Sequence, residues 1–359
     1  MAWTKYKEVK YGTTIPGSTL TDFPLLFSVT SDSDIAAELT SGGGIKFTSA
    51  DGSTDLDFGL YPSTALASGT VLARVKVSPA STASTGDVIC RLYYSSAEST
   101  TEDKAGTFSN NYGYFLAMEE DPSGSAPQML DWVGNANIGT SSGSMTSGDL
   151  VTGAVGNGLD FDGSNDYITV PGTAGNRPTS EITLECQAKP AATSTQILAA
   201  CRTGTIEVSG ATILVISNKF QFYASVNGTS WGVTLAANAN FSTGTNYTVA
   251  GTFTSGTQKL YVDGVAQTAT GSASGSLVYK SSRDWHIGGD TTGTRFSGVI
   301  DEMKLSTVAR SANWLAYSHT NERSNSSTVT LGTEQTGGGS SAPYHAIQQS
   351  QPQRRFARS

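Results

Sequence analysis

The chain has 359 residues, of which 40 are glycine and only 14% are charged, and its formal net charge is −8. This length predicts two domains with separate cores. The acidic balance excludes a nucleic-acid surface on the folded part, and the lack of any apolar run near ~18 residues excludes membrane insertion.

Residues 1–98 are predicted to form an all-β domain. Turns rich in Gly, Pro and Ser separate short apolar runs at the spacing typical of β-sandwiches. The candidate strands are Lys5–Val9, Leu25–Val29, Ile45–Thr48, Leu56–Leu60, Thr70–Val77 and Asp87–Tyr94. Residues 99–111 are expected to connect this domain to a second one at 112–335, whose first strand lies within Tyr112–Asp121.

The most informative stretch of the second domain is Gly158–Pro171. Leu159 and Phe161 alternate with acidic residues, the turn residues 163–166 follow, and Tyr167–Val170 begins a second strand. We therefore expect a β-hairpin with an acidic tip. The Gly/Ser/Thr-rich stretch from Gly134 to Gly148 is expected to be a loop.

Further strands and one helix follow in chain order. The predicted strands are Glu181–Pro190, Ile197–Cys201, Thr212–Ser217, Lys219–Val226, Gly232–Ala236, Asn246–Phe253, Gln258–Val265, Trp285–Gly289 and Phe296–Leu305. Asp263-Gly264 is a strong turn signal for a hairpin. Ser311 is a plausible N-cap for a helix from Ala312 to about Asn321.

With the predicted hairpin, four later segments occur in the order found in laminin-G-like, concanavalin A-like jelly-roll modules. These segments are Tyr247–Phe253, Lys259–Val265, Ile287–Gly289 and Gly298–Arg310. Residues of about 112–322 resemble such a module. The resemblance implies a jelly roll that binds glycans or proteins, with hydrolases among its relatives.

The N-terminal domain carries a resemblance of its own in Asp22–Phe27, Gly44–Gly52 and Leu92–Ala97. These segments are similar to an uncharacterised β-sandwich domain found ahead of laminin-G-like modules in bacterial and phage surface proteins. The expected fold is therefore all-β: a β-sandwich, then a concanavalin A-like jelly roll, then an extended C-terminal tail.

Calcium is the one cofactor with a physical case, because Ca²⁺ prefers carboxylate and carbonyl oxygens from turns. Asp162 and Asp166 flank the acidic turn, and in the resembled family the strand carrying Asp301 runs near the opening hairpin. These three are the candidate ligands. The alternative is that their carboxylates accept hydrogen bonds from backbone N–H groups.

A glycan site needs an exposed aromatic platform with polar neighbours. Trp231, with Asn227 in the same loop, is the candidate, and packing of Trp231 on the sandwich rim is the alternative.

No catalytic residues are predicted. Glu181 and Glu185 share a strand face, but their Cα atoms would lie ~13 Å apart, whereas a retaining glycosidase needs carboxyl groups ~5–5.5 Å apart. Ser141 lies in a Gly-x-Ser-x-Gly pattern without the strand–turn–helix context of a hydrolase. His286, His319 and His345 are too scattered for a triad, and His286 is expected to be a satisfied surface or core histidine.

Three cysteines do not suit a disulfide framework. The interpretation is three buried thiols, with a Cys186–Cys201 bridge as the alternative.

Residues 336–359 combine a Gly/Ser linker with a Gln/Arg segment. This tail is expected to dock on a capsid or other virion protein, or else to be solvated. The candidate anchors are Ile347, Arg354, Arg355, Phe356 and Arg358.

The first five residues lack the pattern of a secretory signal, so the protein is either made in a cytoplasm or has lost a leader. We expect a non-catalytic bacteriophage virion surface component, a capsid decoration or fibre protein, whose jelly roll binds a cell-surface glycan and which could form a homo-oligomer. The alternatives are a bacterial surface or secreted lectin or adhesin and, less favoured, a jelly-roll glycosidase.

Overall fold

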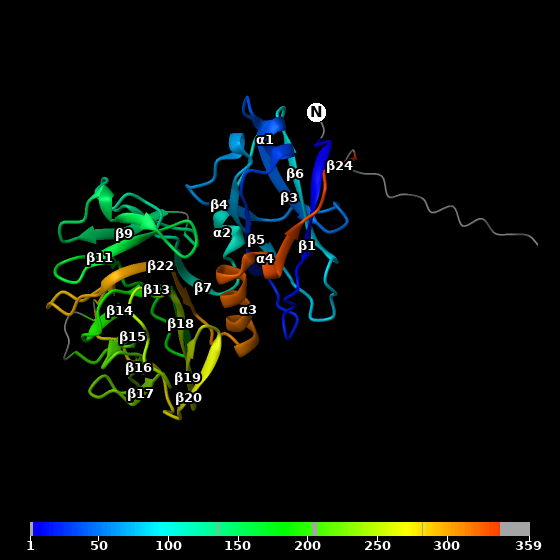
Figure 1. Cartoon of the computed structure of the whole chain (residues 1–359). Coiled ribbons are helices and arrows are strands. Elements are labelled where there is room, and N and C mark those ends of the chain that lie inside the picture. The colour runs from blue at the N-terminus through cyan, green and yellow to red at the C-terminus, as the bar shows by residue number, and fades with distance from the viewer. Residues whose placement is uncertain (1–2, 135, 203–206, 282, 338–359) are drawn as a thin grey trace, which may run out of the picture.

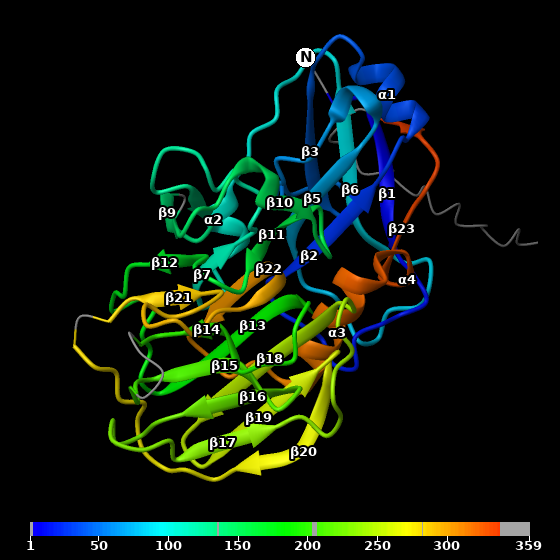
Figure 2. The same cartoon turned by 60° about the vertical axis from the view of Figure 1, so that its left-hand side comes forward.

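The computed structural model describes residues 3–134, 136–202, 207–281 and 283–337. Two β-sandwiches lie side by side, with helix α3 (Ala312–Arg323) at their junction (Figures 1 and 2). The prediction of an all-β fold with a concanavalin A-like jelly roll is confirmed. The short helices are α1 (Ser33–Leu39), α2 (Lys104–Thr107) and α4 (Asn325–Thr328), with 3₁₀ turns at Leu66–Ser68 and Ser147–Asp149.

The N-terminal sandwich has two antiparallel sheets. One has the order β23-β1-β6-β3, with β24 also on β1, and the other has the order β2-β5-β4. Their bounds are β1 Lys5–Tyr11, β2 Phe23–Val29, β3 Gly44–Ser49, β4 Phe58–Leu60, β5 Val71–Val77, β6 Val88–Ser95, β23 Val329–Leu331 and β24 Gln335–Thr336. Buried Val9, Phe27, Phe47, Val75 and Leu92 belong to the core between them.

The end of the chain returns to this first sandwich. Strands β23 and β24 pair with β1, so residues 329–336 extend the N-terminal sheet. The domain boundary predicted from the sequence assigns residues up to 335 to the jelly roll, whereas β23 and β24 belong to a sheet of the first sandwich. Short edge strands with little apolar content leave no local sign of which sheet they will join.

One long antiparallel sheet folds over to make the jelly roll. We call β17-β16-β15-β14-β21-β12-β9 sheet I, and β8-β7-β22-β13-β18-β19-β20 with β10 and β11 sheet II. The sheet I bounds are β9 Ala136–Ser142, β12 Tyr167–Val170, β14 Gln196–Ala200, β15 Ala211–Ile216, β16 Lys219–Ala224, β17 Val233–Ala236 and β21 Trp285–Ile287. Those of sheet II are β7 Tyr112–Leu116, β8 Met129–Asp131, β10 Leu150–Thr152, β11 Asn157–Asp162, β13 Glu181–Pro190, β18 Tyr247–Thr254, β19 Thr257–Val262, β20 Val265–Gly271 and β22 Ser297–Ser306.

The predicted opening hairpin is wrong in its pairing. Strands β11 and β12 form where expected, but β11 pairs with β10 and β22, whereas β12 pairs with β9 and β21. The acidic turn at 163–166 therefore carries the chain from sheet II to sheet I. Alternation of apolar residues specifies which face of a strand is buried, and it does not specify the neighbouring strand.

The loop expected at Gly134–Gly148 is also wrong, because it contains β9. This strand pairs with β8 on one side and β12 on the other. Its Ser and Thr side chains hide the alternation, and only Ile138 packs against the core as a partly buried apolar residue.

The cysteines are unpaired thiols. Cys90, Cys186 and Cys201 are all buried and free, so the alternative of a Cys186–Cys201 bridge is wrong. Burial raises the pKa of each thiol above its ordinary value, which makes all three unreactive as nucleophiles.

Helix α3 has the predicted N-cap, since the Ser311 side chain accepts a hydrogen bond from the Trp314 N–H. Its inner side closes a buried ion cluster, which we define as Arg74, Glu185, Glu302, Lys304 and Glu322. These residues come from β5 in the first sandwich, from β13 and β22 in the second, and from α3. One network of charges therefore joins both sandwiches to the helix.

Arg74 is the centre of this ion cluster. Its Nη2 bonds the carboxylates of Glu302 and Glu322, and its Nη1 donates to the Pro24 carbonyl at 3.1 Å. Lys304 bonds Glu322 and donates to Glu185 Oε1 at 3.2 Å. Although burial opposes ionisation, Lys304 and Arg74 hold the pKa of Glu322 well below its usual value.

Candidate functional site

The three predicted calcium ligands do not come together. Asp162 accepts hydrogen bonds from the N–H groups of Ser164, Asn165 and Asp166, and Asp166 accepts one from the Asp162 N–H at 3.2 Å. Asp301 accepts the N–H groups of Ala154 and Val155. In the parts of the chain that the structure describes, no three His, Cys, Asp or Glu residues form a group that could hold a metal.

Register explains the separation. Strand β22 does run beside β11, as expected, but Ser297 faces Asp162, and Asp301 lies four residues further along the strand. At ~3.3 Å per residue this is ~13 Å. The predicted calcium site of Asp162, Asp166 and Asp301 does not form. Asp162 and Asp166 accept backbone N–H groups in one turn, and Asp301 accepts backbone N–H groups in another.

The glutamates considered for catalysis are structural. Glu185 is 3% exposed under α3, where its Oε1 accepts hydrogen bonds from Lys304 and Ser318. Glu181 Oε2 accepts the Ala309 N–H at 3.0 Å. Ser141 lies on β9 and donates to the Pro122 carbonyl at 2.6 Å, so it is not on a nucleophile elbow.

A row of mostly polar side chains crosses the face of sheet I that points away from the core. Successive strand pairings align one residue from each strand along this row. In spatial order they are Thr140, Thr169, His286, Ala200, Thr212, Tyr223 and Thr234. Because side chains alternate in a strand, this face is opposite to that of the core residues Ile168, Ile213 and Phe222.

Buried charged and polar groups lie over the middle of this row. Asp290 is fully buried, and Arg295 Nη1 lies 3.6 Å from its Oδ1. Asp290 Oδ1 also accepts N–H groups from Thr292 and Thr294, which fixes the carboxylate in the turn after β21. A Cβ at Gly289 would lie 2.7 Å from Cδ of Arg295, so the glycine lets the arginine side chain lie against the strand.

Several atoms of this group make no hydrogen bond. Asp290 Oδ2, His286 Nδ1, and Nε and Nη1 of Arg295 are buried and make no hydrogen bond within the described residues. His286 is 3% exposed, and burial lowers the pKa of its imidazole, so it is neutral at pH 7. The expectation of a satisfied histidine is corrected: His286 is buried but keeps an unused ring nitrogen.

One half-buried aromatic ring lies beside this group, and a second aromatic pair lies with Arg202. Arg295 stacks over Tyr167 at 4.6 Å, and Tyr167 lies 5.7 Å from the His286 ring. Trp231 lies 5.7 Å from Tyr223, with the guanidinium of Arg202 5.8 Å from the Trp231 ring.

The charges of Arg202 and Asp290 interact, which links the Trp231–Tyr223 pair to the group around Asp290. Burial lowers the pKa of Arg202, and the charge of Asp290 opposes that shift. We call Tyr167, Arg202, Tyr223, Trp231, His286, Asp290 and Arg295 the outer-face cluster.

The sequence analysis found one member of this cluster and missed the others. Trp231 was the candidate for a glycan platform, whereas its predicted partner Asn227 bonds Thr229, Ser230 and Ser225 within the loop. Arg202, Asp290 and Arg295 come from loops after β14 and β21. The one signal for them is Gly288-Gly289-Asp290, a carboxylate placed directly after a strand and two glycines. The predicted anchors Ile347, Arg354, Arg355, Phe356 and Arg358 lie outside the described residues.

Comparison with protein-family sequence models identifies the fold class of the second domain. Residues 162–316 match the sequence model of the concanavalin A-like lectin/glucanases superfamily, in its laminin-G-like branch. This segment of the chain is a concanavalin A-like jelly roll. A comparison with curated protein sequences gives no match.

Solved structures with similar folds are distant in sequence. Domain 4 of an extracellular arabinanase from Geobacillus stearothermophilus, in complex with arabinotriose, is 15% identical with a TM-score of 0.45, covering 57% of this chain and 97% of that domain. The binding domain of Paraclostridial Mosquitocidal Protein 1 is 12% identical with a TM-score of 0.46, covering 58% and 52%. A Trypanosoma rangeli sialidase in complex with the inhibitor DANA is 15% identical with a TM-score of 0.41, covering 58% and 32%. The chain thus spans about half or less of the toxin domain and the sialidase.

Within the described residues, none of the helices has the length and apolar content needed to cross a bilayer.

Proposed function

We propose that the jelly roll binds a carbohydrate at the outer-face cluster. The observation that carries this proposal is the set of buried polar atoms on Asp290, His286 and Arg295 that make no hydrogen bond, beside the half-buried Tyr167 ring. A buried polar atom without a partner costs about 1–3 kcal/mol. A ligand that satisfies these atoms would recover that cost on binding.

Sugar hydroxyls suit this set because each can donate and accept. Asp290 Oδ2 would accept a hydrogen bond from one sugar hydroxyl, and Nε and Nη1 of Arg295 would donate hydrogen bonds to the adjacent hydroxyl of the same sugar. Trp231 and Tyr223 offer ring surface to the apolar C–H face of a sugar. The match of residues 162–316 to a superfamily of lectins and glucanases supports this class of ligand.

Binding without cleavage is the form of activity that we propose. Asp290 is the one carboxylate in the outer-face cluster, whereas glycosidases of the usual type need a pair. A screen for turnover on a polysaccharide panel checks this: we expect no reducing ends above background, and release that disappears in Asp290→Asn would contradict it.

The binding test begins with a glycan array and continues with calorimetry on the best ligand. Trp231→Ala should weaken binding roughly five- to tenfold. Asp290→Asn keeps the side chain's shape but replaces an unpaired acceptor, and should weaken binding ~10–100-fold. Trp3→Ala removes an equally half-buried ring from the other sandwich and serves as the matched control. Equal effects of Trp231→Ala and Trp3→Ala would refute the site.

For the biological setting, we propose a bacteriophage virion surface component. The resemblance of residues 1–98 to a domain of bacterial and phage surface proteins supports this, as does the Gln/Arg composition of the tail. Particles assembled with a chain lacking residues 337–359 should lose the protein. Unchanged occupancy would contradict the proposed anchoring, and in that case a bacterial surface lectin or adhesin becomes the better assignment.

A further inference from the structure

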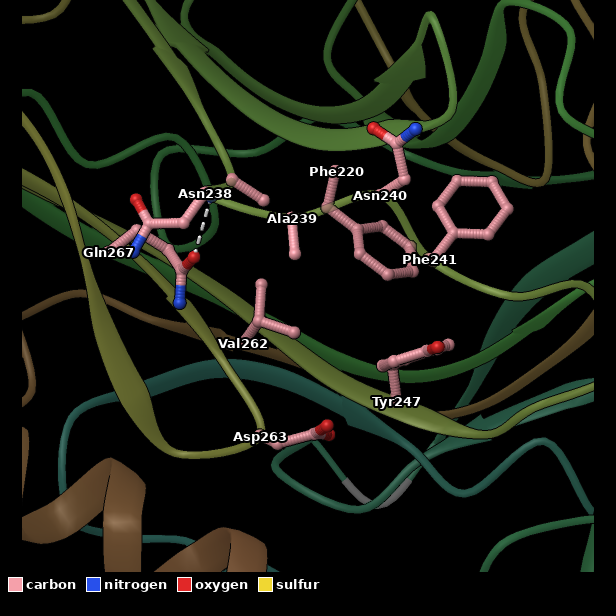
Figure 3. Close-up of a pocket in the computed structure, with 10 residues that line it drawn as sticks. Phe220, Asn238, Ala239, Asn240, Phe241, Tyr247, Val262, Asp263 and Gln267 are labelled. Carbon is pink, nitrogen blue, oxygen red and sulfur yellow. Dashed lines mark hydrogen bonds between the residues drawn. The ribbon is translucent and has the colours of Figure 1, made fainter.

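A cavity, which we call the edge pocket, lies at one edge of the jelly roll, where the chain crosses from β17 to β18. Its volume is about 230 Å³. The 237–241 connection forms one side, and the turn between β19 and β20 forms the other (Figure 3). No residue of the outer-face cluster lines it.

The floor of this edge pocket is apolar and held by the core. Phe220 is 1% exposed and Phe241 5%, and the Tyr247 ring packs 5.3 Å from Phe220. Val262 from β19 and Ala239 from the connection complete the floor (Figure 3). Because these rings also belong to or pack on the jelly-roll core, the floor exists before any ligand arrives.

The rim carries amides and one carboxylate. Asn238 is held in place, since its N–H donates to Gln267 Oε1 at 2.9 Å and its Oδ1 accepts from Thr268. Asp263 Oδ1 accepts the Thr248 N–H at 2.9 Å. Asp263 Oδ2 and the exposed Asn240 amide make no hydrogen bond within the described residues and border the cavity (Figure 3).

We propose that the edge pocket binds one neutral sugar ring, as a carbohydrate site separate from the outer-face cluster. Its volume is below the ~300–1,000 Å³ of pockets for drug-sized ligands, which limits the occupant to one small ring. An apolar floor below a rim of amide and carboxylate groups matches the C–H face and hydroxyl edge of a pyranose or furanose.

Charge selects a neutral sugar over an acidic one. Among the described residues that line the pocket, Asp263 is the one charged side chain and none is cationic. A carboxylated or sulfated sugar would meet repulsion from Asp263, whereas the Lys219 ammonium lies outside the lining and is engaged by the Asn238 carbonyl at 3.2 Å. The outer-face cluster, in contrast, contains Arg202 and Arg295, so the two sites differ in the ligands they favour.

The sites also lie apart. Trp231 precedes β17 and Asn238 follows it, so a ligand at one end of this strand leaves the other end open. The four residues of β17 lie between them and span ~13 Å at ~3.3 Å per residue. The edge pocket therefore adds a second point of attachment and does not depend on the outer-face proposal.

Saturation-transfer NMR with arabinose, galactose, glucose, mannose and N-acetylglucosamine tests the inference on the full chain. We expect transfer to at least one of these sugars, and competition should show no binding of glucuronate. In a chain that also carries Trp231→Ala and Asp290→Asn, which weaken the outer-face cluster, Ala239→Trp fills the cavity from an exposed position and should abolish transfer. Asn240→Ala should weaken binding roughly fivefold through loss of one hydrogen bond.

Two controls separate this site from the first. Thr245→Ala changes an exposed residue between β17 and β18 that does not line the pocket, and Trp231→Ala weakens only the outer-face cluster. Both should leave transfer intact. Absence of transfer from every sugar, or transfer that survives Ala239→Trp in the chain with the weakened outer-face cluster, would overturn the edge pocket. Transfer lost in Trp231→Ala but kept in Ala239→Trp would assign the sugar to the outer-face cluster instead.

Discussion

Replacing Arg74 with methionine should destabilise the whole protein, because it leaves buried carboxylates without their main partner. Arg74 is 1% exposed, and both Glu302 and Glu322 are fully buried. Methionine fills much of the same volume but cannot bond either carboxylate. Lys304 would then be the single cation facing Glu185, Glu302 and Glu322.

The magnitude follows from the cost of a broken buried pair, which is about 3–5 kcal/mol. For a chain of this length, a loss of about 4 kcal/mol corresponds to a fall in Tm of about 5 °C. Lys76→Met on the same strand is the matched control. Lys76 is 23% exposed and pairs with Asp57, which is 36% exposed, so its loss should cost under ~1 kcal/mol.

Urea denaturation followed by tryptophan fluorescence at several pH values measures both effects. The orphaned carboxylates of Arg74→Met should titrate with a raised pKa in the folded state, so its deficit should grow as pH rises from 5 to 8. Adding Glu302→Gln should recover part of the loss. A deficit no larger than that of Lys76→Met would refute the reasoning that the ion cluster holds the sandwiches together.

Three further outcomes are expected. Burial raises the pKa of Glu120 to about 7 and leaves its Oε2 unpaired, so folding is penalised above the unfolded pKa of ~4.3. Glu120→Gln should gain up to about 3 kcal/mol over the native protein between pH 5 and pH 8, and a pH-independent difference in denaturation would contradict this. Asn321 bonds both the N–H and the carbonyl of Leu26, so Asn321→Ala should cost about 2–3 kcal/mol in the same assay, and a loss under ~0.5 kcal/mol would count against that role. A thiol reagent should label none of the three cysteines in the native protein and all three after unfolding; one labelled thiol after unfolding would indicate a Cys186–Cys201 bridge.

Local features were predictable because they depend on neighbours in the chain. The Ser311 cap and the Asp263-Gly264 turn form as expected, and the two-residue turn joins Val262 to Val265 across a hairpin. Alternation also placed most strands within a few residues. These signals arise from backbone geometry and side-chain burial within a single element.

Pairing between distant segments was not predictable from a single sequence. The sequences of β11 and β12 are compatible both with a hairpin and with strands in opposite sheets. In the structure β11 pairs with β22, and β12 pairs with β21. The Arg74 contacts join residues more than 220 positions apart. Arg74 shares a face of its strand with Lys76, so the sequence could only suggest a solvent-facing side chain.

The outer-face cluster was hidden for the same reason. Its charged members lie on loops with no motif, and they meet because β16, β15, β14 and β21 are consecutive strands of sheet I. Trp231 was visible alone because a tryptophan in a polar loop is unusual. The other members come together only through the pairing of strands in sheet I.

A structure of the protein soaked with the best ligand from the glycan array tests the central proposal most directly. We predict a sugar hydroxyl within hydrogen-bonding distance of Asp290 Oδ2 and of the Arg295 guanidinium, with a sugar face against Trp231 or Tyr223. A ligand bound elsewhere on the jelly roll, with Asp290 Oδ2 still unpaired, would contradict it.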